Sequence, residues 1–161
     1  MSNPRLGVVM DPIAGIKYAK DSTLAMLLAA QARGFELAYL EQGDLALRDG
    51  RAFGRLRPLS VRPDPQSWFT LGEPRVEPLA NLQCILMRKD PPFDIEYVYT
   101  TYILERAELE GVLVANRPQG LRDMNEKVYT AWFPQCCAPT LITRSLPSAT
   151  PSRSSRSPVS R

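Results

Sequence analysis

Three charged residues follow an apolar run near the middle of the chain and could bind a small anionic molecule. Residues 84–87 read Cys-Ile-Leu-Met, which predicts a buried strand, and Arg88, Lys89 and Asp90 come directly after it. Open α/β sheets bind their ligands where strands end. An arginine there can hold a carboxylate with two parallel hydrogen bonds, which a lysine cannot do. The alternative is that Arg88 and Asp90 form a structural ion pair that fixes the loop.

The segment after these charges is stiff. Pro91 and Pro92 lack backbone N–H groups and have restricted φ angles. Asp94 then has the side chain of a helix N-cap residue. We therefore expect a rigid, charged loop between a strand and a helix, held in place for a ligand or a partner.

A second polar segment follows the apolar run of residues 6–10. It begins at Asp11, carries Lys17 and Lys20, and leads to a helix that starts near Ser22. A helix N-terminus favours an anion, because its N–H groups are unpaired and its dipole is positive there. The segment has a single glycine, so it is not a dinucleotide-binding G-x-G-x-x-G loop. The alternative is that both lysines are ordinary surface residues.

The elements that position these segments alternate between strands and helices. Apolar runs of strand length are separated by stretches whose apolar residues recur at helical spacing. Each long helix is expected to begin at a capping residue and to end at a glycine, Gly34 or Gly111. Strands are expected at residues 6–10, 35–40, 84–87, 112–116 and 140–144, and helices at residues 21–33 and 94–110, briefly from Pro118, and at 125–133.

A different pattern occupies the region between these units. Asp49-Gly50 is a hairpin turn signal, and the arginines after it suggest an exposed strand with a solvated face, which includes Arg55 and Arg57. Trp68 and Phe69 lie in a proline-rich stretch and are expected to fold back as a local apolar plug. In the 94–110 helix, we expect the tyrosines at helical spacing to line the core or a groove.

The predicted fold class is α/β: a Rossmann-like, three-layer domain with a mostly parallel sheet and an antiparallel hairpin insertion.

The composition excludes several kinds of chemistry. The chain has no histidine, which removes Ser-His-Asp and Cys-His nucleophile systems and histidine-based metal sites. Its three cysteines lack C-x-x-C spacing and predict neither a disulfide framework nor a metal site. Carboxylates, lysines and arginines remain, and these groups suit the binding of phosphates and carboxylates.

The charge distribution argues against nucleic acid as a partner. Residues 145–161 contain three of the 20 lysine and arginine residues and none of the 17 acidic ones, so they account for the whole net charge of +3. A neutral body lacks the clustered cations of a nucleic-acid-binding face. No apolar run approaches the roughly 18 residues of a membrane span, and no signal peptide is visible. We therefore expect a cytoplasmic protein with neither nucleic acid nor membrane as a partner.

Several segments resemble, in the same order, the N-terminal domain of the bacterial glutathione synthetases. The resemblance covers roughly residues 5 to 144. It includes the Met-Arg-Lys-Asp-Pro-Pro-Phe-Asp stretch described above. The segments that carry it are residues 7–13 (Gly-Val-Val-Met-Asp-Pro-Ile), 20–22 (Lys-Asp-Ser), 87–94, 102–107 (Tyr-Ile-Leu-Glu-Arg-Ala) and 121–127 (Leu-Arg-Asp-Met-Asn-Glu-Lys).

Glutathione synthetases join γ-glutamylcysteine to glycine using ATP and Mg²⁺, in a pre-ATP-grasp domain followed by an ATP-grasp domain. The resemblance implies that this chain contains the first of these domains and is part of such a ligase, with a homo-oligomer as a further option. It implies that Lys127 contacts ATP, although from the residues alone Lys127 is a solvated lysine. The residues that it implies for substrate binding are Asp11, Pro12, Ser22, Arg88, Lys89 and Asp90.

The resemblance stops near Arg144. The family's glycine-rich phosphate loop and magnesium ligands are missing from the sequence, so we expect no catalytic residue, no metal ligand, no stable binding of ATP or Mg²⁺ and no ligation by this chain alone. The expected organisation is a pre-ATP-grasp domain at 1–123, a truncated start of the ATP-grasp region at 124–144, and a disordered, frameshifted Ser/Arg/Pro tail at 145–161.

Two alternatives remain open. The tail could be a phosphorylated arginine-serine segment instead of the product of a lost reading frame. The domain could be a freestanding module that binds γ-glutamylcysteine or glutathione, or that serves in oligomerisation, without catalysis.

Overall fold

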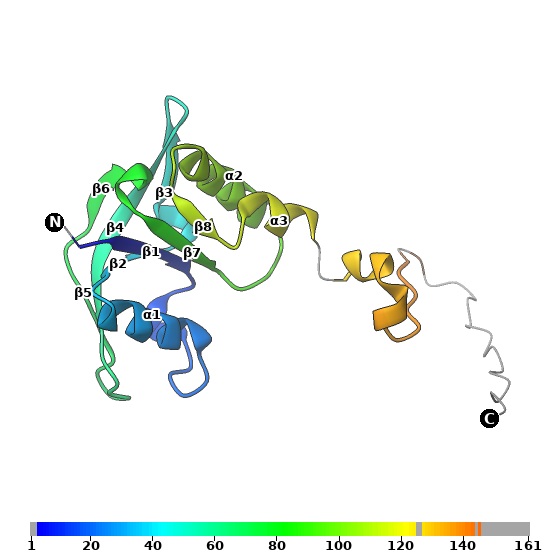
Figure 1. Cartoon of the computed structure of the whole chain (residues 1–161), viewed down its shortest axis with the longest axis horizontal. Coiled ribbons are helices and arrows are strands. Elements are labelled where there is room, and N and C mark those ends of the chain that lie inside the picture. Colours follow the sequence, from blue (N-terminus) through cyan, green and yellow to red (C-terminus); the bar gives the residue numbers. More distant parts are fainter. Residues whose placement is uncertain (1–2, 125–126, 144, 146–161) are drawn as a thin grey trace, which may run out of the picture. The chain divides into compact units, whose positions relative to one another are not determined.

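The computed structural model describes residues 3–124, 127–143 and 145. The chain divides into two compact units, Met1–Met124 and Asn125–Arg161, and each is described separately. Figure 1 labels the elements of the first unit, and its colours follow the sequence.

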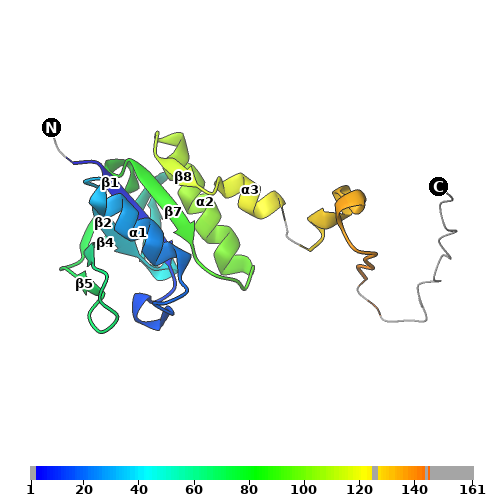
Figure 2. The same ribbon diagram turned by 60° about the horizontal axis from the view of Figure 1, so that its bottom comes forward.

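Four parallel strands form the centre of the first unit. β1 pairs with β2 on one edge and with β7 on the other, and β7 pairs with β8. The run from Leu6 to Met10 is fully buried, as expected for a central strand of a parallel sheet that is covered on both faces. Figure 2 shows β1 and β7 side by side. The strands are β1 (Arg5–Met10), β2 (Glu36–Leu40), β7 (Cys84–Arg88) and β8 (Leu113–Ala115).

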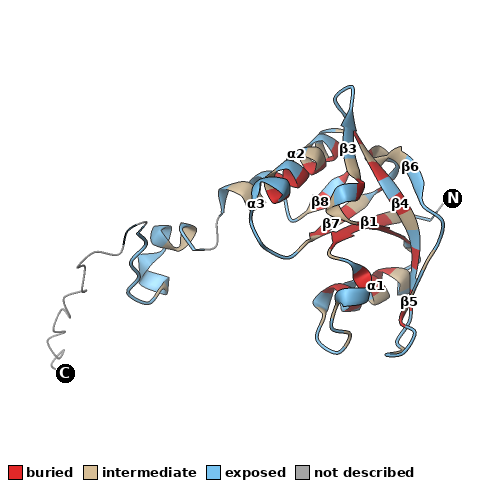
Figure 3. Ribbon diagram, turned by 180° about the vertical axis from the view of Figure 1, so that it is seen from behind, coloured by how far each residue is buried: buried red, intermediate tan, exposed pale blue. Residues whose placement is uncertain are grey.

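Helices cover both faces of this sheet. α1 (Ser22–Ala32) packs its leucines with Val8 and Tyr39 on one face. α2 (Ile95–Leu109) packs on the other face with Val9 and Ile85, and α3 (Pro118–Asp123) lies beside it. Figure 3 shows the buried residues concentrated on the strands and on the helix sides that face them. The expected three-layer α/β fold is confirmed.

The ends of the two long helices also follow the sequence prediction. Asp21 Oδ1 accepts hydrogen bonds from the backbone N–H groups of Thr23 and Leu24, at 2.7 and 3.0 Å, and so caps α1. Asp94 caps α2 in the same way. Gly34 and Gly111, which follow the two helices, have φ angles of 86° and 98°. Such positive values favour glycine over every other residue.

Four antiparallel strands extend the sheet beyond β2. The turn between the first two has φ angles of 51° at Asp49 and 76° at Gly50, as a two-residue hairpin requires. The second of them, β4, is the longest and pairs with all the others and with β2. The strands are β3 (Leu45–Arg48), β4 (Arg51–Val61), β5 (Phe69–Leu71) and β6 (Arg75–Pro78).

The expected solvated face of β4 holds for Arg55, which is exposed and whose Nε lies 2.8 Å from Asp44 Oδ1. It is wrong for Arg57, whose Nε atom is buried. The strand curls over the turn that follows β2, which brings an acid against it. The expected apolar plug is confirmed, because Trp68 is buried against α1 and β2 and its ring packs on Phe69.

The expectation that the α2 tyrosines line the core is wrong for two of them. Tyr99 and Tyr102 are about half exposed, and the alternative that they line a groove stays a prediction. The side that faces the sheet carries several small residues, which let the helix approach the strands closely. The buried residues of α2 are Tyr97, Thr100, Thr101, Leu104 and Ala107.

The second unit contains less regular structure than predicted. Residues 125 and 126 of the expected 125–133 helix lie outside the described residues, and the rest holds only a 3₁₀ turn, η4 (Tyr129–Trp132). Residues 140–143 form no strand, and residue 144 of that expected strand is not described. Neither η4 nor the next turn, η5 (Pro134–Cys136), buries a residue, and so short a helix is marginal without a packed face. Except for residue 145, the predicted tail lies outside the described residues.

An ion pair joins the start of β1 to β6. It lies at the opposite end of β1 from Met10. Arg5 donates two hydrogen bonds to the Glu77 carboxylate, at 2.7 and 2.8 Å. The hydrogen bonds from Arg5 lower the pKa of Glu77 below its usual value of 4.5. The pair therefore stabilises the fold above that usual pKa, and its contribution is lost as the pH falls through the lower folded value.

Replacing Glu77 with glutamine tests this pair. We expect Glu77→Gln to lower the free energy of unfolding by about 1 kcal/mol at pH 7, because a two-bond, mostly buried pair becomes a neutral contact. The difference from the wild type should shrink below about pH 4.5, where the wild-type carboxylate takes up its proton. Urea unfolding at several pH values measures it. Glu73→Gln, at an exposed acid, is the control, and a pH-independent difference would contradict the assignment.

Candidate functional site

The predicted charged residues meet where the strand order reverses. From β1 the chain moves to β2 on one side, whereas β7 continues to β8 on the other side. The carboxyl ends of β1 and β7 are neighbours, because Met10 and Arg88 are register partners. Asp11 follows one strand and Lys89 follows the other. This is the switch point at which open α/β sheets bind ligands.

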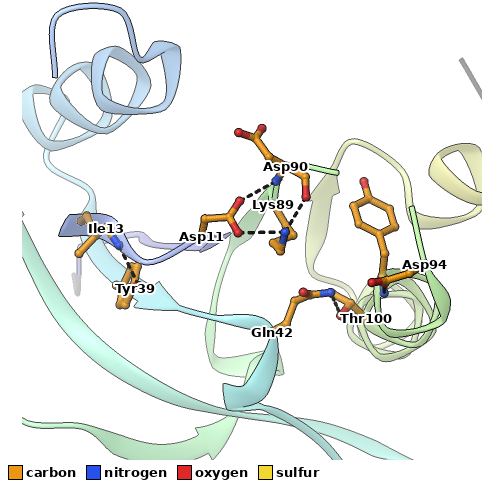
Figure 4. Close-up of polar contacts among 9 residues, drawn as sticks. Asp11, Ile13, Tyr39, Gln42, Lys89, Asp90, Asp94 and Thr100 are labelled. Carbon is orange, nitrogen blue, oxygen red and sulfur yellow. Dashed lines mark hydrogen bonds and ion pairs between the residues drawn. The ribbon is translucent and has the colours of Figure 1, made fainter. Parts of the chain in front are cut away.

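Asp11 and Lys89 form the centre of the site. Lys89 Nζ lies 2.9 Å from Asp11 Oδ1, and it donates a second hydrogen bond to the carbonyl of Asp90 at 2.6 Å. The backbone N–H of Asp90 donates to Asp11 Oδ2 at 2.9 Å, so both carboxylate oxygens hold the β7 loop (Figure 4). The Lys89 side chain is only 15% exposed. These contacts fix the loop after β7 to the end of β1.

Arg88 contacts a helix instead of the neighbouring acid. Its Nε donates to Thr23 Oγ1 at 3.1 Å and its Nη2 donates to Ser22 Oγ at 3.0 Å. The alternative ion pair between Arg88 and Asp90 does not occur among the described residues. The contacts use only part of the guanidinium, which has five N–H donors. A cation at a helix N-terminus opposes the helix dipole, so an anion bound there would be stabilised by both.

A cavity of about 530 Å³ opens beside these residues. Asp11 and Asp90 line it from the strand ends, and the loop between β1 and α1 lines the rest. Both lysines of that loop have exposed side chains, which can reach a ligand in the cavity. The lining residues are Asp11, Pro12, Gly15, Ile16, Lys17, Lys20, Asp21 and Asp90.

The structure therefore brings most of the predicted residues together. Asp11, Lys89 and Asp90 are in direct contact, and Arg88 reaches Ser22 beside them. The remaining two are Pro12, which lines the cavity, and Lys127, which is exposed and belongs to the second unit. The substrate-binding and ATP-binding roles of these residues stay predictions.

Sequence reasoning missed a buried tyrosine under the site. The hydroxyl of Tyr39 accepts a hydrogen bond from the backbone N–H of Ile13 at 3.1 Å and donates one to Glu41 Oε1 at 2.6 Å. Burial raises the pKa of Tyr39, and Glu41 adds to the rise. A tyrosine inside an apolar strand is itself the signal, because a buried phenol hydroxyl needs a hydrogen-bond partner.

The donors of a metal site are not found in the described part of the chain. Residues 3–124, 127–143 and 145 contain no group of three or more acidic or cysteine side chains placed to hold a metal ion. We therefore assign no step to a metal in the part of the chain that the structure describes. Over the same residues, no helix is both long and apolar enough to cross a membrane.

Removing the Asp11 carboxylate tests the centre of the site. We expect Asp11→Ala to lower the free energy of unfolding by about 1–2 kcal/mol, because a mostly buried lysine loses its partner and the N–H of Asp90 loses its acceptor. Amide exchange at Asp90 should also become faster. Urea unfolding and amide exchange measure the two effects, with Asp64→Ala, in an exposed turn, as the control. Unchanged exchange at Asp90 would show that this carboxylate does not hold the loop.

Comparisons with known proteins show the family of this chain. The family model described as "Prokaryotic glutathione synthetase, N-terminal domain" matches residues 5–122. The glutathione synthetase of Pseudomonas putida is 64% identical over 140 residues, and those of Shewanella oneidensis and Escherichia coli K12 are each 56% identical over 140 residues. Each match covers 87% of this chain but 44% of the relative, so the chain spans less than half the length of these curated relatives. The chain belongs to the prokaryotic glutathione synthetase family, and residues 5–122 are its N-terminal domain.

Proposed function

We propose that this chain supplies the substrate-binding side of an ATP-dependent carbon–nitrogen ligase that joins γ-glutamylcysteine to glycine. The observation that carries the proposal is the meeting of Asp11, Arg88 and Lys89 at the switch point, beside a cavity of about 530 Å³. That volume is within the range of small-molecule sites.

The chemistry of the dipeptide matches the charges around the cavity. At neutral pH γ-glutamylcysteine carries two carboxylates and one ammonium group. Arg88 can bind one carboxylate through the N–H groups that Ser22 and Thr23 leave free, with the positive end of the α1 dipole beside it. Lys17 and Lys20 are available for the other carboxylate, and Asp90 can receive the ammonium group.

The ligation itself needs more than these residues. In the whole enzyme, bound ATP and Mg²⁺ would supply the activation of a carboxylate of the dipeptide. We propose that Lys127 contributes to ATP binding in the whole enzyme, and that residues 1–123 form the dipeptide-binding domain, 124–144 begin the ATP-grasp region and 145–161 are a tail. The chain alone is expected to be inactive. A cytoplasmic location is part of the proposal.

Titration with the dipeptide tests the proposed site. We expect γ-glutamylcysteine to shift the backbone NMR signals of residues 11–22 and 88–90, with a dissociation constant in the millimolar range, about 4 kcal/mol of binding free energy. Arg88→Ala should weaken binding about tenfold or more, because a charge-assisted hydrogen bond contributes about 1.5–3 kcal/mol.

The matched control is Arg62→Ala. Arg62 also donates to a threonine hydroxyl, that of Thr70 at 2.9 Å, but it follows β4 and does not belong to the strand ends of β1 and β7. Its loss should leave the affinity unchanged. Shifts spread over the whole sheet, or equal losses for the two variants, would contradict the proposed site.

A further inference from the structure

We infer that Tyr39 is a positioning residue that holds the loop between β1 and α1 in the conformation that lines the cavity. The functional part of this inference rests on the proposed function, because the loop carries the lysines assigned to the dipeptide. The phenol hydroxyl accepts a hydrogen bond from Ile13 of that loop, as Figure 4 shows, and donates one to Glu41 at the start of the turn after β2. These contacts lie beneath the site and do not touch a ligand.

The loop has few hydrogen bonds that reach other elements. Its hydrogen bonds are mostly local, such as those from Gly15 N to Pro12 O at 2.8 Å and from Lys20 N to Lys17 O at 2.9 Å. Among the described residues, the bond from Ile13 to the Tyr39 hydroxyl is the one that joins residues 12–20 to another element. The Ile13 side chain is also buried, at 3% exposure. This hydrogen bond therefore anchors η1 (Ile13–Gly15), the turn that begins the loop, while Ile16 and Tyr18 further along pack against the core beside α1.

The anchor is itself fixed. Tyr39 is 1% exposed and has no room to change rotamer within the α1-side core. Its hydroxyl uses its proton on Glu41 Oε1, at 2.6 Å, which leaves the oxygen free to accept from Ile13. Because burial raises the pKa of Tyr39, the hydroxyl keeps this proton at neutral pH.

Glu41 is held in turn by the short helix η2 (Gln42–Asp44). The backbone N–H of Glu41 donates to Asp44 Oδ2 at 2.9 Å, and Asp44 Oδ1 accepts from Arg55 of β4 at 2.8 Å. The chain of contacts thus runs from β4, through η2 and Tyr39, to the loop. An acceptor with this support fixes the direction of the Tyr39 hydroxyl.

The same turn contacts the other side of the site. Gln42 Nε2 donates to Thr100 Oγ1 of α2 at 3.1 Å (Figure 4). α2 begins directly after the loop that carries Lys89 and Asp90. Glu41, the N-cap of η2, therefore binds Tyr39 of β2, and Gln42 of η2 binds Thr100 of α2, through two separate hydrogen bonds. Because the two hydrogen bonds are separate, each can be removed by its own substitution and the effects on the loop compared.

The test removes one oxygen atom. In Tyr39→Phe the ring still fills its place, but the N–H of Ile13 loses its acceptor. We expect amide exchange at Ile13, measured by NMR on the full chain, to become about tenfold faster or more. The β1 and β7 amides should keep their protection. Two controls are Tyr97→Phe, which removes the same atom in the α2-side core, and Gln42→Ala, which removes the contact with α2. Neither control should change exchange at Ile13.

Binding of γ-glutamylcysteine to the same variants completes the test. We expect the dissociation constant of Tyr39→Phe to rise about three- to tenfold, the loss of one neutral hydrogen bond. Unchanged exchange at Ile13, or equally faster exchange throughout the sheet, overturns the inference. Faster exchange at Ile13 with unchanged affinity overturns it as well. If the wild type does not bind the dipeptide but exchange at Ile13 still depends on Tyr39, the proposed function fails and the loop anchor is upheld.

Discussion

The pairing of β1 between β2 and β7 is the constraint on which the rest of this domain depends. Because both neighbours are parallel to β1, their carboxyl ends meet at one edge of the sheet, and residues distant in the sequence become neighbours. β1 is buried on both faces, so helices must cover it from two sides. The position of the Asp11–Lys89 pair follows directly from this arrangement. Neither partner would meet the other without the register of Met10 with Arg88.

The site combines charges that would be unfavourable in isolation. Arg88 lies at the positive end of the α1 dipole, where Asp21 caps the helix. The mostly buried Lys89 is balanced by Asp11. The loop of Lys17 and Lys20 adds further positive charge next to them. This balance favours a ligand with more than one carboxylate, and the absence of histidine means that no imidazole changes charge near neutral pH.

Local signals in the sequence predicted the elements better than their partners. The apolar runs, the capping acids and the glycines after the helices located the four parallel strands and both long helices. The partner of Lys89 could not be found this way, because the ion pair joins residues 78 positions apart through strand order. The inner face of α2 was misassigned because periodicity favoured the tyrosines, whereas Thr100, Thr101 and Ala107 allow close packing. Tyr39 was missed because its role depends on a hydrogen bond to a backbone group.

The Arg5–Glu77 pair has a practical consequence for engineering this domain. It lies at the amino end of β1, and the six residues of that strand span about 16–20 Å, which separates the pair from the charged residues after Met10. Substitutions that far apart usually have additive effects. Stabilising changes at the Arg5–Glu77 pair should therefore raise the melting temperature without the loss of function that often follows when rigidity is added near a binding site.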